Sequence, residues 1–349
     1  MPDTIAVAVL NWNGQSLLER YLPKLVADSK GLGKVYLIDN ASTDNSISWT
    51  QEKLPEVEII KLDDNYGYAG GYNKAIAQLE EELVVLINSD IESTPNWLQP
   101  IAARFAAEPK LGALQPKILD LKDRSKFEYA GASGGYMDRL GYAFCRGRLF
   151  DDLERDEGQY NDYQECFWAT GACLAVRKSA YNEVRGLYAT LFAHMEEIDL
   201  CWRLKNRGHV VGATGRCHVY HLGGGTLQHD NPRKAYLNFR NNLFLLLKND
   251  HRPGIRGRIL FRQVLDGLAG IRFLTEGKAN FCAAVIRAHR DFRKQRAYMA
   301  SKRKAEIEAC RGRSVPKAAL AGRYDGSVVW AFFVKGAKRW SDLDTGHIS

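Results

Sequence analysis

Residues 5–14 read IAVAVLNWNG, and this stretch decides the fold. Its first six residues are apolar without interruption, which is typical of a strand buried on both faces of a parallel sheet. Polar turn formers at 11–14 end that strand, and an amphipathic helix is predicted from about 16 to 27. The pattern recurs downstream, with strands predicted at 35–38, 57–62 and 83–87 and helices at 45–53 and directly after a glycine-rich turn at 65–71.

Strands that alternate with helices at this spacing predict an α/β fold with a doubly wound, mostly parallel sheet flanked by helices. In such sheets, ligands bind beyond the carboxyl ends of the strands. A polar cluster follows each of the four predicted strands, at residues 11–13, 39–44, 65–67 and 88–90. The sequence therefore predicts one shared site at this edge of the sheet.

The pattern is less regular beyond residue 116. Turn residues accumulate from 117 to 165, which indicates hairpins or irregular excursions. Regular elements are predicted again as a strand near 168–176 and helices near 178–184, from about Glu196, and at 232–248.

Charge divides the chain into two regions. The whole chain carries a net charge of +8, yet residues 251–349 hold 21 Lys and Arg against 8 Asp and Glu, and residues 1–250 hold 28 against 33. We therefore predict a catalytic domain at 1–250 and a basic, amphipathic helical region at 251–349. The N-terminus lacks a signal-peptide pattern, no apolar run is long enough to span a membrane, and the seven cysteines form no CxxC pair. These features favour a cytoplasmic protein with free thiols.

Acidic residues follow two of the predicted strands. Asp90, preceded by Asn88, suits a hard divalent cation held together with phosphate oxygens, although an Asp in this position also serves as a turn or cap residue. Asp39 and Asp44 could accept hydrogen bonds from a ribose or a base, or could only cap the next helix. Gly67 and Gly71 would let a ligand approach the backbone closely, or would serve one tight turn.

A third acidic cluster is the densest. Glu196, Glu197 and Asp199 lie within four residues among apolar neighbours in FAHMEEIDLCWRL. Helix N-termini favour acids, so capping is one interpretation. The other is a general base, because partial burial raises the pKa of a carboxylate toward neutrality.

Two histidines precede three glycines in His218-Val219-Tyr220-His221-Leu222-Gly223-Gly224-Gly225. An imidazole from this pair could bind the same metal ion as Asp90, and the glycine loop could admit a phosphate. A structural histidine beside a turn is the alternative.

Taken together, the ordered motifs of the chain resemble glycosyltransferase family 2, in its rhamnosyltransferase-like, single-addition branch. The resemblance covers roughly residues 5–250 and depends on VLNWNG, LIDNASTDNS, NYGYAGGYNKAI, INSD, TGACLAVRKSAY, HMEEIDLCWRLKNRG and VYHLGGGT. It implies a GT-A type fold, a nucleotide-sugar donor, a Mg²⁺ or Mn²⁺ ion and inversion at the anomeric carbon.

The resemblance also implies roles for individual residues. Glu197 matches the general base, Asp90 the metal-binding acid and His221 a histidine that completes the metal site. Substrate and nucleotide contacts are expected from Asn11, Asn13, Asp39, Asp44, Asn65, Gly67, Gly71, Asn88, Gly171 and Asp199. Two positions depart from the family pattern: Asn88 replaces the first acid of the D-x-D element, and Glu196-Glu197 replaces an E-D pair, so the choice of base between these two stays open.

The substrates are predicted less closely. Rhamnose on a thymidine diphosphate, transferred to a saccharide or lipid-linked saccharide in cell-surface polysaccharide synthesis, is the expectation that the resemblance favours. The processive Q-x-x-R-W element is absent, which favours addition of a single sugar. A catalytically silent nucleotide-binding or scaffold protein on the same fold is the alternative, and a nucleotidyltransferase is a weaker one.

Basic residues frame apolar ones between 252 and 313, and again in VVWAFFVKGAKR at 328–339. This pattern is typical of interfacial helices on anionic lipid, so we expect a peripheral protein at the inner face of the plasma membrane. An ordinary packed helical appendage is the alternative. No recognition motif accompanies the charge, so nucleic acid is not expected as a partner.

Overall fold

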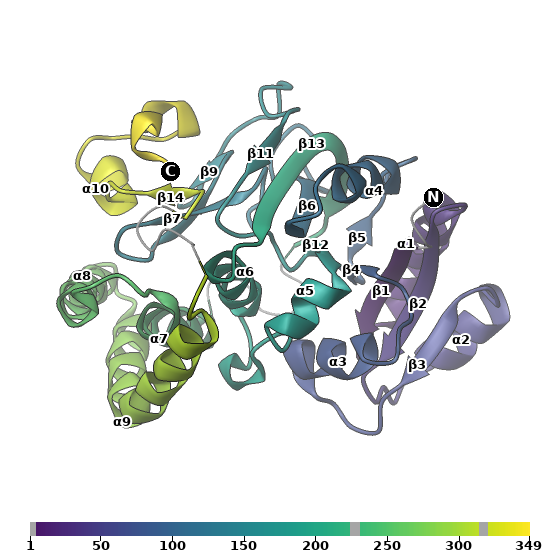
Figure 1. The fold of residues 1–349 in the computed structure, drawn as a ribbon, viewed down its shortest axis with the longest axis horizontal. Helices are drawn as coiled ribbons and strands as arrows, with labels where there is room; N and C mark the ends of the chain where they lie inside the picture. Colours follow the sequence, from purple (N-terminus) through teal and green to yellow (C-terminus); the bar gives the residue numbers. More distant parts are fainter. Residues whose placement is uncertain (1–4, 224–230, 314–319) are drawn as a thin grey trace.

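The computed structural model describes residues 5–223, 231–313 and 320–349 (Figure 1). Within these residues a nine-stranded central sheet has the order β11-β13-β6-β12-β4-β1-β2-β3, with β5 paired to β13. Its strands are β1 (Ile5–Asn11), β2 (Gly33–Asp39), β3 (Glu58–Lys61), β4 (Leu83–Asn88), β5 (Ile91–Glu92), β6 (Leu111–Asp120), β11 (Tyr163–Glu165), β12 (Cys173–Arg177) and β13 (Val210–His221).

The sheet is mostly parallel, which confirms the predicted fold class. Strands β1 to β4 run parallel to one another, and β6 is parallel to β13. Strand β12 runs antiparallel between β4 and β6, and β11 is antiparallel to β13 at the edge. The parallel register pairs Asn11 with Asp39 and Leu10 with Asn88, so the carboxyl ends of β1, β2 and β4 meet at one edge.

Helices cover both faces of this sheet because the side chains of its strands alternate between two cores. Ile5, Val7 and Val9 of β1 belong to one core, and Ala6 and Ala8 to the other. The first core includes apolar residues of α1 and α4, and the second includes those of α3, α5 and α6. These helices are α1 (Gln15–Ser29), α2 (Ser46–Lys53), α3 (Gly67–Ile76), α4 (Leu98–Ala107), α5 (Lys178–Glu183) and α6 (Glu196–Asn206).

The segment predicted to be irregular, 117–165, begins inside β6 and continues as a set of hairpins. Four of its short strands join one C-terminal strand in a second sheet of order β10-β9-β8-β7-β14. These strands are β7 (Gly135–Asp138), β8 (Ala143–Cys145), β9 (Arg148–Leu149), β10 (Asp152–Leu153) and β14 (Arg323–Tyr324). Short 3-10 helices occur at Ala189–Leu191, Trp340–Asp342 and Thr345–His347.

The described residues from 232 onward are mainly helical, as predicted for 232–248 and for 251–349. Their helices are α7 (Pro232–Asn249), α8 (Ile255–Thr275), α9 (Ala279–Ala309) and α10 (Val328–Phe333). Helix α9 packs along α7, where the Phe244 and Phe292 rings lie 5.9 Å apart, and Arg303 donates to the Leu247 carbonyl at 3.1 Å. In the described parts of the chain, none of the helices combines the length and the hydropathy needed to cross a bilayer.

Several elements differ from the prediction. The strand expected near 168–176 begins only at Cys173, because residues 168–172 form a loop beside the end of β4. Helix α4 and the strands β5, β6 and β13 were not predicted. Strand β13 carries register shifts at two points, which break the alternation of apolar and polar residues that marks a strand.

Candidate active site

The carboxyl ends of β1 and β2 place Asn11 and Asp39 side by side and almost fully buried, at 1% and 2% exposure. One oxygen of each side chain, Asn11 Oδ1 and Asp39 Oδ1, is buried without a hydrogen-bond partner. The other Asp39 oxygen accepts from the Ser42 backbone N–H at 3.1 Å. Buried acceptors are normally paired, so these two are suited to donors of a bound ligand.

Asn13 and Asp44 lie beside this pair, but their side chains already accept hydrogen bonds from the protein backbone. Asn13 is exposed and its Oδ1 accepts from the Thr43 backbone N–H at 2.7 Å. Asp44 accepts from the backbone N–H groups of Gln15 and Ser46, both at 3.1 Å. Although burial raises the pKa of Asp44, these hydrogen bonds lower it overall. The contacts of Asp44 favour the capping interpretation, since it accepts from the first N–H of the helix that follows it, α2, and also from that of α1.

The glycine-rich turn is tied to the same edge through Asn40. Asn40 Nδ2 donates to Asn65 Oδ1 at 2.9 Å, and that oxygen also accepts from the Gly67 N–H at 2.9 Å. Gly67 has a φ of 66° and open space where a side chain would be. Gly71 differs, because a Cβ there would lie 2.8 Å from Leu10 Cδ1. Gly71 therefore permits close packing of α3 on β1, whereas Gly67 lies open.

Asp90 and His221 are brought together from positions 131 residues apart. Asp90 follows β4, His221 ends β13, and His221 Nε2 lies 3.2 Å from Asp90 Oδ1. A third residue joins them, because His221 Nδ1 lies 3.3 Å from Glu128 Oε2. All three side chains are buried. Burial alone would lower the pKa of His221, but the two carboxylates outweigh it and raise this pKa to about 10. The surroundings thus stabilise positive charge at the imidazole.

The donor set fits a divalent ion with two protein ligands. Ligands about 2.1 Å from an octahedral ion and at right angles to each other lie ~3 Å apart, which is close to the Asp90–His221 separation of 3.2 Å. Glu128 faces the other ring nitrogen, the position from which a carboxylate orients a metal-binding imidazole. In residues 5–223, 231–313 and 320–349, no three acidic, His or Cys side chains converge on one ion. Phosphate and water oxygens would therefore complete its coordination.

Glu196 and Glu197 begin α6, where Met195 adopts a left-handed conformation with φ of 73°. Burial raises the pKa of both carboxyls, and the neighbouring Glu197 charge raises that of Glu196 further. Glu196 is 7% exposed and its Oε2 has no hydrogen-bond partner. Glu197 is half-buried, so it is more open to solvent than Glu196.

The loop at 168–172 contacts both the start of α6 and the end of β4. A Cβ at Gly171 would lie 3.7 Å from the Glu197 Cβ and 2.8 Å from Tyr68 Oη, which donates to the Gly171 carbonyl at 2.7 Å. The next residue, Ala172, accepts from the Asn88 N–H at 3.0 Å. Asn88 is two residues from Asp90, so this loop touches both the start of α6 and the end of the strand that leads to Asp90.

Asp199 stands apart from the other two acids of α6. It is fully buried and its carboxylate is bound by Arg203 at 2.7 Å, Lys248 at 2.8 Å and Asn249 at 2.7 Å. Although burial raises the pKa of Asp199, these cations bring it down to about 2. Both oxygens are occupied within the chain. Its contacts therefore favour a structural role over the predicted one in substrate binding.

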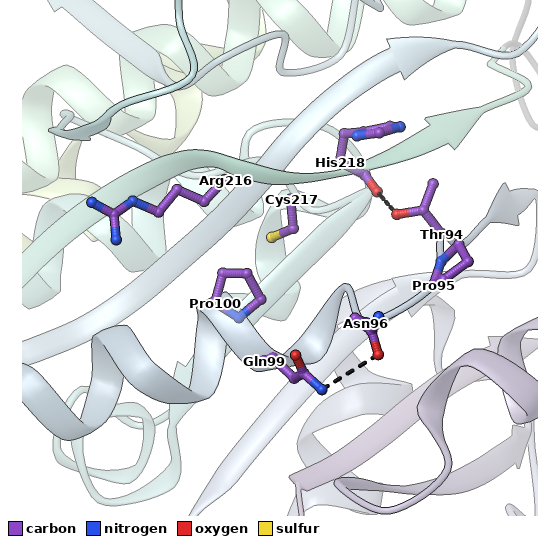
Figure 2. A pocket seen from close by; sticks show the side chains of 8 residues that line it. All are labelled: Thr94, Pro95, Asn96, Gln99, Pro100, Arg216, Cys217 and His218. Atoms are coloured by element: carbon purple, nitrogen blue, oxygen red, sulfur yellow. Dashed lines mark hydrogen bonds between the residues drawn. The ribbon is translucent and has the colours of Figure 1, made fainter.

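A surface pocket of about 450 Å³ lies elsewhere (Figure 2). It contains none of the predicted site residues and is lined by Thr94, Pro95, Asn96, Gln99, Pro100, Arg216, Cys217 and His218. Thr94 Oγ1 donates to the His218 carbonyl at 2.6 Å, as Figure 2 shows. Of the two candidate histidines, only His221 meets Asp90. Gly224 and Gly225 of the predicted phosphate loop lie outside the described residues.

Glu128 and Tyr68 were not predicted. Glu128 lies in the irregular segment after β6, where no periodicity or motif distinguishes it from other acids. Tyr68 is part of the NYGYAGGYNKAI motif, in which the glycines, not the tyrosines, indicate a ligand site. A Cβ at Gly223 would lie 3.0 Å from Glu128 Oε1, which relates the glycine after His221 to the same cluster.

A mostly parallel sheet with a buried Asn–Asp pair and an Asp–His pair at its carboxyl edge is the arrangement expected of a GT-A type glycosyltransferase. The chain belongs to glycosyl transferase family 2, whose model matches residues 5–185. The N-acetylglucosaminyl-diphospho-decaprenol L-rhamnosyltransferase of Mycobacterium tuberculosis is 28% identical over 251 residues, which cover 64% of this chain and 81% of that protein. The protein is thus a rhamnosyltransferase-like member of its family.

Solved structures agree on the fold. TarS of S. aureus in complex with UDP-GlcNAc superposes with a TM-score of 0.53 at 16% identity, and the match covers 88% of this chain and 92% of that one. GalNAc-T7 with UDP, GalNAc and Mn²⁺ also gives a TM-score of 0.53, at 13% identity, over 74% of this chain and 54% of that one.

Proposed function

We propose that this glycosyltransferase moves a single sugar, with inversion, from a nucleotide diphosphate to an acceptor hydroxyl and requires a divalent ion. The observation that carries the proposal is the contact of Asp90 with His221 beside the loop that meets Glu197. A carboxylate and an imidazole at metal-ligand spacing suit a diphosphate leaving group, and a half-buried carboxyl nearby suits proton removal.

On the donor side, Asn11 and Asp39 would receive the nucleoside, because each keeps one buried oxygen free to accept a hydrogen bond. Asp90 and His221 would hold the ion, with Glu128 orienting the imidazole. When bound, Mg²⁺ or Mn²⁺ would supply Lewis-acid stabilisation of the negative charge on the departing diphosphate.

On the acceptor side, Glu197 would act as the general base. Its carboxylate takes the proton of the acceptor hydroxyl while the hydroxyl oxygen forms a bond to the anomeric carbon. The bond from that carbon to the diphosphate oxygen breaks on the opposite face, and the electron pair leaves with the nucleotide. Burial favours this role because it raises the pKa of Glu197 above that of an ordinary glutamate, toward the value of an effective base at neutral pH.

The sugar and acceptor follow from the relative of known activity. That protein is named as an L-rhamnosyltransferase acting on N-acetylglucosaminyl-diphospho-decaprenol. We therefore propose rhamnose as the sugar, carried on thymidine diphosphate, and a lipid-linked saccharide of cell-surface polysaccharide synthesis as the acceptor.

The test compares wild type with Glu197→Gln and Glu196→Gln, using thymidine-diphosphate rhamnose, Mn²⁺ and a panel of saccharide diphospholipids. Release of nucleotide and transfer of sugar are both measured, and thermal unfolding shows that each variant is folded. Wild type should transfer the sugar, and Glu197→Gln should lose about 10²- to 10⁴-fold in rate, the usual contribution of a general base. Glu196→Gln, the matched control, should lose less than tenfold.

Two results would overturn parts of this proposal. If folded Glu197→Gln stays within threefold of wild type while Glu196→Gln is inactive, the base is Glu196. If wild type releases no nucleotide from any sugar donor in Mg²⁺ or Mn²⁺, the silent nucleotide-binding alternative replaces the enzymatic one.

A further inference from the structure

Helix α8 has its apolar side facing solvent. Six large apolar side chains along it are at least half exposed: Leu260, Phe261, Val264, Leu268, Ile271 and Leu274. At 100° per residue they fall within an arc of roughly 140° on one side of the helix. Gly257 and Gly267 of this helix have open space around them, so nothing in the described chain covers that side. An exposed apolar patch of this kind marks an interaction surface.

The opposite, buried side of α8 holds a polar network. Arg262 donates to Asp266 at 2.8 Å and to Asn242 Oδ1 at 2.6 Å, and Asp266 Oδ2 lies 3.3 Å from His289 Nε2. Arg262 and Asp266 are 4% and 0% exposed. These contacts fix the rotation of α8, since turning its apolar side inward would expose the network and leave its partners on α7 and α9 unpaired.

Helix α10 extends the same surface. Trp330, Phe333 and Val334 are 57%, 51% and 58% exposed. The Arg272 guanidinium of α8 lies 5.3 Å from the Phe333 ring centroid, which places the two helices next to each other. Figure 1 shows both at the same side of the molecule, away from the N-terminal strands. The surface formed by α8 and α10 therefore presents nine apolar side chains.

The charges on this surface are mainly positive. Arg256 and Arg272 flank the apolar side of α8, and Lys335 is exposed just after α10. The one acid of α8 itself, Asp266, is buried, and Glu276 beyond its end is paired with Arg272 at 2.8 Å. Apolar side chains framed by cations match an anionic bilayer, in which acyl chains receive the former and headgroups the latter.

We propose that α8 and α10 form a docking surface for an anionic lipid bilayer, on which α8 lies in the plane of the headgroups. The proposal goes beyond sugar transfer and does not depend on it. A helix of 21 residues offers a contact about 32 Å long, and the surface can remain docked while the carboxyl edge of the sheet works on its substrates.

The test is co-sedimentation with vesicles, either pure phosphatidylcholine or phosphatidylcholine with 30% phosphatidylglycerol added. We compare wild type with Val264→Asp/Leu268→Asp, with Arg256→Glu/Arg272→Glu, and with Ile307→Asp. The last is the matched control, because Ile307 is a 39% exposed apolar residue of α9 that lies outside the surface. All substituted positions are exposed, so thermal unfolding should be unchanged, and turnover with a water-soluble acceptor should equal that of wild type.

Wild type should partition onto anionic vesicles at least tenfold better than onto neutral ones. The Asp double variant should lose at least tenfold on anionic vesicles, the Glu double variant at least twentyfold at about fivefold per basic residue removed, and Ile307→Asp less than twofold. The proposal fails if wild type does not bind anionic vesicles, or if binding is insensitive to both double variants. It also fails if sedimentation velocity shows a dimer that Val264→Asp/Leu268→Asp dissociates while vesicle binding is absent, since a second copy then covers the surface.

Discussion

Replacing Asp199 by asparagine should destabilise the protein strongly, and the outcome decides whether this residue is structural or binds substrate. Asp199 is fully buried and neutralises Arg203 and Lys248, which are buried beside it. Asparagine keeps the shape of the side chain but removes its charge. Two buried cations then face each other across α6 and α7 without a counter-charge.

Arg203 and Lys248 are each 3% exposed, so water cannot take over the role of the lost carboxylate. Removing one partner of a buried ion pair typically costs about 3–5 kcal/mol. An independent figure comes from the pKa of Asp199, since a fall from 3.8 to about 2 on folding corresponds to about 2 kcal/mol of stability. With an unfolding entropy of ~2.1 cal/mol/K per residue, a loss of 3–5 kcal/mol lowers the Tm of this chain by about 4–7 °C.

The assay is thermal unfolding at pH 7 without ligands, for wild type, Asp199→Asn and the matched control Glu52→Gln. Glu52 forms an exposed pair with Lys53, so its replacement should change the Tm by less than about 1 °C. Adding Lys248→Met to Asp199→Asn should restore part of the loss, because it removes one of the unpaired cations. A structural role is refuted if Asp199→Asn unfolds within 1 °C of wild type and instead weakens binding of the sugar donor.

The pH dependence gives a second check on the same residue. The pKa of Asp199 is lower in the folded protein than in the unfolded chain. Its contribution to stability is therefore complete above about pH 4 and is lost as the pH falls toward 2. Wild type should lose more stability than Asp199→Asn over this interval. Equal losses in acid titrations followed by circular dichroism would contradict the assignment.

Three further predictions concern the site. Because burial raises the pKa of Glu197, kcat/KM should fall as the pH drops through roughly 6–7 rather than near 4.5, and a pH–rate profile flat down to pH 5 would exclude Glu197 as the base. Glu128→Gln should weaken Mn²⁺ binding by about 10- to 100-fold, measured by calorimetry, because the carboxylate no longer orients His221; unchanged affinity would remove Glu128 from the metal site. Gly171→Ala should lower the transfer rate at least tenfold, because its Cβ would lie 2.8 Å from Tyr68 Oη, and Tyr68→Phe should lose less; full activity of Gly171→Ala in a rate assay would show that the loop adapts.

Much of the fold could be predicted because its signals are local. The apolar runs of β1, β2 and β4 and the polar residues that follow them lie next to each other in the chain, and parallel pairing then brings those residues to one edge. Strand β13 was not predicted because its register shifts break the alternation of apolar and polar side chains. Strands β1 to β4 and part of β12 thus followed from pattern, and the remainder of the sheet depended on tertiary pairing.

The residues of the candidate site also differ in how far the sequence predicts them. The Asp90–His221 pairing joins β4 to β13; the residue types suggested a shared ion and the resemblance to the family singled out His221, but no spacing in the chain predicted the contact. Glu128 carries no local signal at all. Glu197 and Asp199 look alike in sequence, yet one is half-buried beside Gly171 and the other is enclosed by Arg203 and Lys248. They differ because α7, which carries Lys248, packs against α6 beside Asp199, and the local sequence does not predict that packing.

The contacts of α7 with α6 and α9 determine how far the protein can be shortened. Lys248 and Asn249 at the end of α7 bind Asp199 of α6. Helix α9 bonds α7 through Arg303, and its Glu306 pairs with Arg207, just after α6, at 2.9 Å. A fragment that stops near residue 250 would keep every residue of the sheet's polar edge but lose the outer support of the helix that bears Glu197. Expression of residues 1–250 alone should therefore give an unstable product, because the helices beyond residue 250 brace the helix that bears Glu197.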